Sequence, residues 1–352
     1  MQKELKAIRR RMVLDEPYHL SFCTLKRLET YYIVISDDTD CGIGEITPLP
    51  GYGRETSETI QVALKIFIKS LLEGVTIDSL IENNKDIYPF TVSALATARD
   101  ILDIGSRDIF NPIVPRKVPI AAICRQVDES ELCNFVCELI KYGYHVIKIK
   151  IGWMDLEEDI ERINIISDVM SENIELRIDA NEALSLSDTI YLCNKISHLR
   201  IALLEQPLPR TQWDDYQILV NEVPFPIMLD ESIWNILDIQ RAAECGVQLI
   251  KLKLCKHVGI KGCIQMINEA RDMGLKIVLG NGVQSLIGNC IEAYIHDLLH
   301  IDTAGEFNGF TKIKETSRIK EFAISNGQLI DHGISNLIDF SDDEVIASIN
   351  IS

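Results

Sequence analysis

Three short apolar runs in the middle of the chain each end in an acidic residue. They are residues 176–181 (LRIDAN), 202–207 (ALLEQP) and 227–232 (IMLDES). We interpret each run as a buried strand that ends in a carboxylate, namely Asp179, Glu205 and Asp230. The runs recur at about 25 residues, the interval of one strand plus one helix in a βα repeat. This pattern predicts a parallel sheet with three carboxylates side by side at one edge.

Predicted strands and helices alternate through most of the chain. With 352 residues, the chain is long enough for an eightfold βα barrel, which needs about 250 residues, and a smaller second unit. The candidate strands of the barrel are residues 118–124, 145–151, 174–179, 201–205, 226–230, 248–254, 275–280 and 298–304. They alternate with amphipathic stretches. The sequence therefore predicts an α/β fold with a closed, TIM-like (β/α) barrel over residues 116–319.

The first 115 residues have a different pattern, with strands before helices. Residues 31–36 and 41–45 flank a polar turn and predict a hairpin, and two stretches of helical periodicity follow. Strands followed by helices indicate an α+β unit. Two prolines at 112 and 115 mark its end, and the proline- and glycine-rich residues 47–53 predict an exposed loop.

Charge and composition narrow the class of partner. A formal net charge of −18 argues against nucleic acid or an anionic membrane as a partner, because both require a basic face. The ten cysteines lack the paired spacing of a disulfide framework, and we see neither a signal-length apolar segment nor a run long enough to cross a bilayer. We therefore expect a cytoplasmic protein that binds a small molecule.

Lysines occupy two of the candidate strands at alternating positions. Lys148 and Lys150 lie on the second strand, and Lys251 and Lys253 lie on the sixth, so each pair points to one side of its strand. The second and sixth strands of an eightfold barrel face each other. Burying an unpaired ammonium costs several kcal/mol, so such lysines should be paired or functional. The ordinary alternative is that they reach solvent while the acids cap the following helices.

Three carboxylates with open positions for water and substrate suit Mg²⁺. The seven histidines show no grouping for zinc. A divalent cation that chelates a substrate carboxylate would stabilise the enediolate formed when the α-proton is removed. Crowding by Lys148 and by a metal would disfavour the charged form of Lys150 and make it a usable base. Two opposed lysines then fit a two-base racemase or epimerase.

Several of these residues stand in motifs that resemble a known family. The motifs are Gly42-Ile43-Gly44-Glu45, Lys148-x-Lys150, Asp179-Ala180-Asn181, Glu205-Gln206-Pro207, Asp230-Glu231-Ser232 and Lys253-x-x-Lys256-x-x-Gly259. Together they resemble the muconate lactonizing enzyme subgroup of the enolase superfamily. The resemblance implies a barrel closed by an N-terminal capping domain over residues 1–115, with the C-terminal tail, residues 320–352, packed on that domain.

The resemblance also implies roles for individual residues. Mg²⁺ would bind Asp179, Glu205 and Asp230, and Lys150 and Lys253 would form the acid/base pair. Lys148 would assist electrostatically and contact substrate, and Asn181 and Glu231 would lie behind the metal ligands.

The reaction within that subgroup is less constrained. The residues after the hairpin, 44–50, look most like the dipeptide epimerases that interconvert L-Ala-D-Glu and L-Ala-L-Glu. Alternatives are an o-succinylbenzoate synthase, a muconate cycloisomerase-like lyase or an N-acylamino acid racemase, because similar machinery serves several reactions. A metal-stabilised binding protein without catalysis is a further alternative, and a homo-oligomer is common among such barrels.

The chain departs from the dipeptide epimerase pattern in three places. Val258 replaces a glycine, residues 280–285 replace a segment that usually holds methionine and glutamate, and residues 302–308 lack the Asp-x-Asp that holds a dipeptide ammonium. Asp302 or Glu306 could offer that carboxylate instead, although ordinary loop acids are an equal alternative. Cys124 and Arg125 follow the first strand, where the arginine could bind a second substrate carboxylate.

Overall fold

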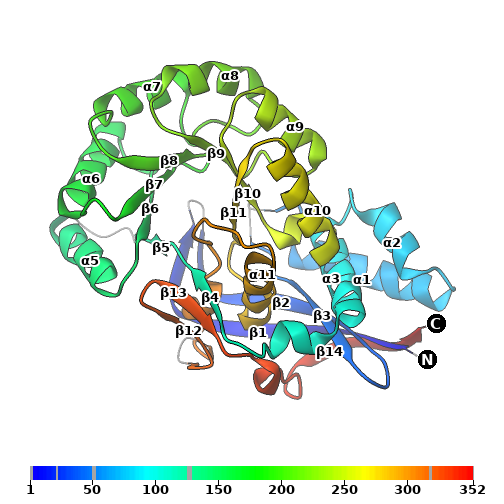
Figure 1. Cartoon of the computed structure of the whole chain (residues 1–352). Helices are drawn as coiled ribbons and strands as arrows, with labels where there is room; N and C mark the ends of the chain where they lie inside the picture. The colour runs from blue at the N-terminus through cyan, green and yellow to red at the C-terminus, as the bar shows by residue number, and fades with distance from the viewer. Residues whose placement is uncertain (1–2, 21–22, 50–52, 125–128, 317–318, 352) are drawn as a thin grey trace.

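The computed structural model describes residues 3–20, 23–49, 53–124, 129–316 and 319–351. Figure 1 shows a curved parallel sheet ringed by helices, and beside it an antiparallel sheet with its own helices. Among the described residues, no helix combines the length and apolarity needed to cross a membrane.

The parallel sheet has seven strands in the order β11-β10-β9-β8-β7-β6-β5. The strands are β5 (Ala122–Ile123), β6 (Val146–Lys150), β7 (Glu175–Asp179), β8 (Ile201–Glu205), β9 (Ile227–Leu229), β10 (Leu249–Leu252) and β11 (Lys276–Leu279). The helices between them are α5 (Glu129–Lys141), α6 (Leu156–Val169), α7 (Leu186–Lys195), α8 (Trp213–Glu222), α9 (Ile236–Glu244) and α10 (Gly259–Asp272), followed by α11 (Leu286–Leu298). The helices α5 to α10 line the outside of the curved sheet (Figure 1). The predicted (β/α) barrel is confirmed.

The prediction of an eighth strand at residues 298–304 is wrong. Leu298 is the last residue of α11, and His300 has a positive φ of 47° that turns the chain out of the helix. The barrel is closed instead by isolated bridges at Gly305 and Glu306. The Glu306 N–H donates to the Leu279 carbonyl at the end of β11 (2.9 Å), and Gly305 bonds to the backbone just before β5. The end of α11 could not be located from the sequence, because the apolar residues continue past Leu298 and predict a strand.

The first predicted strand, residues 118–124, is divided in two. Its first part belongs to β4 (Arg116–Pro119), which pairs antiparallel with β13 (Gln328–Asp331). The hairpin of β12 (Phe322–Ser325) and β13 completes this small sheet, in the order β12-β13-β4. Only the short β5 pairs in parallel with β6.

The antiparallel sheet has the order β14-β1-β2-β3. Its strands are β1 (Lys3–Leu20), β2 (Cys23–Ser36), β3 (Cys41–Ile46) and β14 (Glu344–Ile351). The β2–β3 pairing confirms the predicted hairpin, and β14 brings the end of the chain beside β1. The helices that follow β3 are α1 (Ser57–Leu72), α2 (Ile77–Asn84), α3 (Pro89–Ile104) and α4 (Ser106–Phe110). The division at residue 115 and the assignment of residues 320–352 to the capping domain stay predictions.

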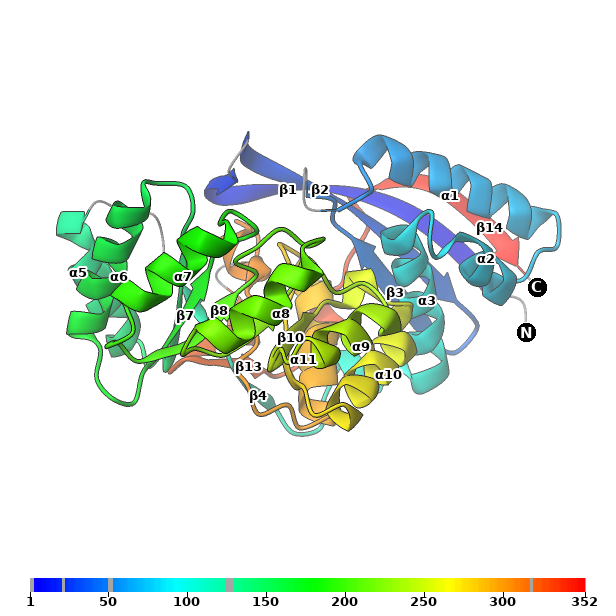
Figure 2. The same ribbon diagram turned by 90° about the horizontal axis from the view of Figure 1, so that it is seen from above.

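The antiparallel sheet and its helices pack on the barrel at the side of α10 and α11 (Figure 2). A Cβ at Gly44 would lie 1.8 Å from the carbonyl oxygen of Ala94, so glycine lets α3 approach β3 closely. Gly259 has φ +69°, and a Cβ there would lie 2.8 Å from the Ala96 side chain. The preceding Val258 has φ −79°, a conformation open to any residue, so this departure carries no backbone strain.

Three short 3₁₀ helices complete the described structure: η1 (Leu254–Lys256), η2 (Gly309–Lys312) and η3 (Ser335–Leu337).

Candidate active site

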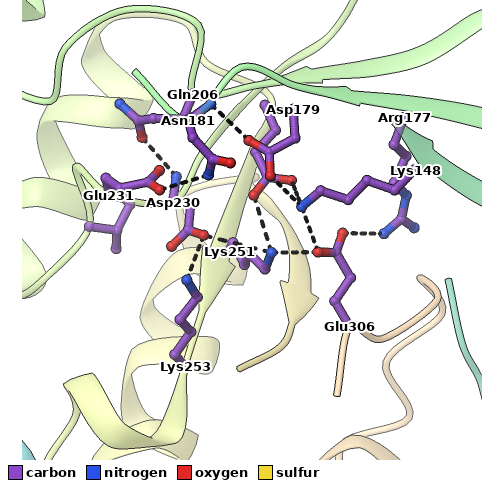
Figure 3. Close-up of polar contacts among 12 residues, drawn as sticks. Lys148, Arg177, Asp179, Asn181, Gln206, Asp230, Glu231, Lys251, Lys253 and Glu306 are labelled. Carbon is purple, nitrogen blue, oxygen red and sulfur yellow. Dashed lines mark hydrogen bonds and ion pairs between the residues drawn. The ribbon is translucent and has the colours of Figure 1, made fainter. Parts of the chain in front are cut away.

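Three carboxylates stand in order at the C-terminal edge of neighbouring strands. Asp179 ends β7, Glu205 ends β8 and Asp230 directly follows β9, and no more than 1% of any of them is exposed. We call these three residues the carboxylate arc. The arrangement arises because parallel strands all end at the same edge of the sheet, which in a barrel is the edge that carries active sites. Figure 3 shows Asp179 and Asp230 with the nearby Lys148, Lys251 and Lys253.

Lys148, on β6, bridges the first two members of the arc. Its Nζ lies 2.8 Å from Asp179 Oδ2 and 2.6 Å from Glu205 Oε2. Burial disfavours the charged ammonium, but the carboxylates of Asp179, Glu205 and Glu306 together raise the pKa of Lys148 well above its usual value. Lys148 is therefore a fixed positive charge inside the barrel.

Lys251, on β10, bridges the second and third members of the arc, Glu205 and Asp230. Its Nζ lies 3.1 Å from Glu205 Oε1 and 3.6 Å from Asp230 Oδ2. Burial opposes its charge, yet Glu205 and Glu306 raise the pKa of Lys251 above its usual value. Each pair of neighbouring carboxylates in the arc therefore shares one lysine ammonium.

Glu306 lies beneath the arc and joins three basic groups. Its Oε2 is 2.8 Å from Lys148 Nζ and 2.5 Å from Lys251 Nζ, and its Oε1 is 3.3 Å from Arg177 Nη1. Burial alone would favour the neutral acid, but these three cations hold the pKa of Glu306 well below its usual range. We expected Glu306 to offer a carboxylate to substrate at the rim; both of its oxygens are instead engaged by buried cations (Figure 3).

Asp230 has two further lysine contacts. Lys253 Nζ lies 2.6 Å from Asp230 Oδ2, and Lys256 Nζ lies 3.2 Å from Oδ1 and donates to the Asp230 carbonyl (2.7 Å). The pKa of Asp230 is well below its usual value because these cations overcome the cost of burial. Burial lowers the pKa of Lys253, and crowding by Lys256 and Lys251 adds to this against the attraction of Asp230. Lys253 is therefore deprotonated more readily than an exposed lysine, because it is buried and because two other ammoniums surround the same acid.

Lys150 stands at the other end of the arc, on the partly open side. Its Nζ lies 4.0 Å from Asp179 Oδ2 and donates to Asn181 Oδ1 (2.9 Å). The Asn181 amide donates in turn to Glu231 Oε1 (3.0 Å). Asn181 has φ +42°, a left-handed conformation that asparagine tolerates better than most residues. Glu231 and Asn181, which we predicted to lie behind the metal ligands, therefore form a series of hydrogen bonds that ends at Lys150.

Gln206 fixes the position of the Asp230 loop. It has φ +36° and is fully buried, and its Oε1 accepts from the backbone N–H groups of Asp230 (2.9 Å) and Ser232 (3.2 Å). Its amide donates to the Tyr216 hydroxyl (2.8 Å). In this strand-end motif, Glu205 is a candidate metal ligand, and the next residue, Gln206, positions the neighbouring candidate ligand Asp230.

The remaining predicted residues are Asp302, which lies away from the arc, Cys124, whose backbone N–H donates to the Lys148 carbonyl (2.7 Å), and Arg125. Asp302 is exposed beside Lys276, at the start of β11, so it lies at the opposite end of that strand from the rim. Cys124 follows β5 and is buried, which raises the pKa of its thiol to about 11. Arg125 lies outside the described residues. The exposed position of Asp302 corrects our expectation that it sits at the rim.

Sequence reasoning assigned no role to several residues that the structure brings into the site. Lys251 was noted only for its alternation with Lys253. Gln206 and Lys256 appeared only as positions in the family motifs, and Arg177 only within the run of residues 176–181. Arg177 and Lys251 precede predicted site residues by two positions, so the same period-two argument could have placed them one layer below the rim. Nothing in the sequence connects them to Glu306.

The carboxylate arc offers the oxygen donors of a divalent-cation site. Carboxylate oxygens are the ligands that Mg²⁺ prefers. Asp179 and Glu205 converge on the Lys148 ammonium, and Glu205 and Asp230 converge on the Lys251 ammonium. As arranged here, no group of three acidic, histidine or cysteine side chains among the described residues forms a ready metal cluster. The residues fit Mg²⁺ in chemistry, and in this structure the ammonium groups of Lys148 and Lys251 lie between the carboxylates.

Comparisons with known proteins agree with this geometry. The chain is similar to an N-succinyl-L-Arg/Lys racemase from Bacillus cereus, with 23% identity over 322 residues that cover 86% of each chain. It is also similar to the chloromuconate cycloisomerase CbnB from Cupriavidus necator, with 22% identity over 80% of each chain.

A dipeptide epimerase from Enterococcus faecalis V583, solved with Mg and the dipeptide L-Leu-L-Tyr, superposes with a TM-score of 0.82. The match has 19% identity and covers 94% of this chain and 97% of that one, so it shows the shared fold. Residues 131–329 match the family described as enolase C-terminal domain-like. The chain belongs to this family, and so to the enolase superfamily that its strand-end motifs indicated.

Proposed function

We propose that this protein is a Mg²⁺-dependent racemase or epimerase that transfers a proton at the carbon α to a carboxylate. One observation carries the proposal: a lysine stands at each end of the carboxylate arc. Lys253 Nζ lies 2.6 Å from Asp230, and Lys150 Nζ lies 4.0 Å from Asp179. Lys253 directly follows β10 and Lys150 ends β6, and these two strands lie four positions apart in the sheet. Two bases on opposite sides of a planar intermediate can remove a proton from one face and return one to the other.

Asp179, Glu205 and Asp230 would hold the cation. Bound Mg²⁺ would supply positive charge to the substrate carboxylate and so lower the barrier to removal of the α-proton. Neutral Lys253, whose pKa burial lowers, would accept the proton from one stereoisomer. Lys150, held by Asn181, would donate from the opposite face. Lys148 stays charged throughout and stabilises negative charge at the centre of the site.

The substrate we propose first is a dipeptide, on the resemblance to the dipeptide epimerases. The N-acylamino acid racemases are the main alternative, and one observation favours them. The two acids that we considered for a dipeptide ammonium do not present a carboxylate at the rim: Asp302 lies at the start of β11, and Glu306 is buried among three cations. An N-acylated substrate needs no such partner, because its nitrogen carries no charge.

Deuterium exchange separates these functions. The protein is incubated with Mg²⁺ in deuterated water with each stereoisomer of a panel of dipeptides and N-acylamino acids. An epimerase washes deuterium into the α-position of its substrate and inverts the configuration, whereas an o-succinylbenzoate synthase or a cycloisomerase would do so with none of the panel.

Variants then assign the two bases. Lys150→Ala and Lys253→Ala should each abolish inversion, and each should leave exchange from one stereoisomer. Lys117→Ala, on the exposed face of β4, is the control. Inversion that persists at the wild-type rate in both active-site variants would exclude the two-base proposal. A binding protein without catalysis would instead show neither inversion nor exchange in the wild type.

A further inference from the structure

We infer that Lys251 is an internal counter-ion that competes with a divalent cation for the carboxylate arc, and that Glu306 keeps hold of Lys251 when the cation binds. The inference rests on the proposed metal site at Asp179, Glu205 and Asp230. It goes beyond that site, because it assigns to Lys251 and Glu306 the control of metal affinity.

Two lysines stand within the arc, and their contacts differ in strength. Lys148 is bound tightly to the arc, at 2.8 Å from Asp179 and 2.6 Å from Glu205. Lys251 is bound more loosely to it, at 3.1 and 3.6 Å, and its shortest contact is the one to Glu306 at 2.5 Å. Lys251 is therefore the ammonium that can leave the arc with the smaller loss of contacts.

Glu306 makes that exchange feasible in a buried site. Only 3% of Lys251 is exposed, so an ammonium that left the arc without another partner would be left desolvated and unpaired. Glu306 Oε2 already accepts from Lys251, while Arg177 contacts the other oxygen of Glu306. The charge of Lys251 thus stays paired whether or not a cation occupies the arc. The position of Lys251 and the occupancy of the arc become one coupled equilibrium.

This coupling predicts opposite effects for two substitutions. Lys251→Met removes the competing charge and keeps the apolar stem, so it should tighten Mg²⁺ binding by about tenfold to a hundredfold. Glu306→Gln removes the negative charge that pairs with Lys251 and so returns Lys251 to the arc, and it should weaken binding by about tenfold. In the double variant the weakening should largely disappear, because no Lys251 remains to return.

Lys256→Met is a matched control. Lys256 is buried like Lys251 and also contacts Asp230, but its other polar contact within the described residues is to the Ile233 carbonyl (3.3 Å) rather than to Glu205 or Glu306. If charge alone mattered, Lys256→Met would tighten binding as much as Lys251→Met. We expect a clearly smaller gain, and no coupling to Glu306→Gln. Lys117→Met, on the exposed face of β4, controls for the change in net charge.

The experiment measures metal binding directly. Mg²⁺ is titrated calorimetrically into the full chain, and Mn²⁺ binding is followed by electron paramagnetic resonance, with circular dichroism to verify folding of each variant. If Glu306→Gln alone does not fold, the double variant, which loses one charge of each sign, is compared with Lys251→Met.

Equal affinities for wild type and Lys251→Met would overturn the inference, as would equal gains from Lys251→Met and Lys256→Met. Metal binding by Lys251→Met alone would support it most strongly. Deuterium exchange by the wild type is scored separately, so the proposed reaction can stand if the counter-ion inference fails.

Discussion

Glu45 of β3 accepts two hydrogen bonds from Ser285, the N-cap of α11. The Ser285 backbone N–H lies 2.7 Å from Oε1 and its hydroxyl 2.5 Å from Oε2, and the N–H of Gly288 also donates to Oε2 (2.9 Å). One carboxylate from the antiparallel sheet thus satisfies the open N-terminus of a barrel helix. The hairpin motif Gly42-Ile43-Gly44-Glu45 therefore joins the two parts of the chain.

Removing that carboxylate should destabilise the whole protein. Glu45→Ala leaves several buried donors without an acceptor, and we expect a loss of about 2–4 kcal/mol in the free energy of unfolding, measured by urea denaturation. Thr47→Val, which removes only one donor to Glu45, should cost about 1 kcal/mol. Equal losses in the two variants would show that Glu45 does not join the two parts in this way.

Glu306 and Asp302 provide a paired test of burial against exposure. Glu306→Gln leaves three buried cations with one acceptor fewer, so we expect a loss of about 3–5 kcal/mol in the free energy of unfolding. Asp302→Asn changes an exposed residue and should stay within about 0.5 kcal/mol of wild type. Thermal and urea unfolding of both variants would check this, and a mild Glu306→Gln would contradict the role of Glu306 as the centre of the ion network.

Glu292 should make stability depend on pH. It is fully buried on α11 and accepts from Asn281, and burial raises its pKa to about 8. In the unfolded chain it ionises near pH 4.5, so folding retains a proton between these two values. The contribution of Glu292 to the free energy of unfolding is therefore fully present below about pH 4.5. It falls as the pH rises towards 8, by at most about 1.4 kcal/mol per pH unit.

Glu292→Gln removes this proton linkage. The free energy of unfolding of the variant, relative to wild type, should rise between pH 5 and pH 8 in urea denaturation. A constant offset can arise from the amide that replaces a carboxyl oxygen without a hydrogen-bond partner. A difference that does not change with pH would mean that Glu292 ionises normally in the folded protein.

Asn181 should affect one direction of proton transfer more than the other. Asn181→Gly suits the left-handed backbone at this position and removes the acceptor that holds Lys150. We expect exchange that depends on Lys150 to fall by about tenfold to a hundredfold, because the amine is no longer positioned. Exchange that depends on Lys253 should change little. Deuterium exchange from each stereoisomer would show the asymmetry, and equal losses would argue against a positioning role for Asn181.

The period-two and βα patterns predicted much of this protein. They located Asp179, Glu205 and Asp230 at successive strand ends, and the lysines of β6 and β10 on the sides that face the site. These predictions succeed because strand alternation and parallel order depend on local spacing alone. The eighth strand was placed too early because Gly305 and Glu306 make only isolated bridges, whereas the apolar run before them is helical.

Only the tertiary structure decided which charges meet. Lys148 and Glu306 are 158 positions apart, and Glu45 and Ser285 are 240 apart, so no local pattern relates them. The sequence by itself determined the fold class, the family motifs and the identity of the candidate ligands. Pairing in the barrel interior depends on which side chains a closed sheet brings within about 3 Å in a low-dielectric space, and that follows from packing of the whole chain.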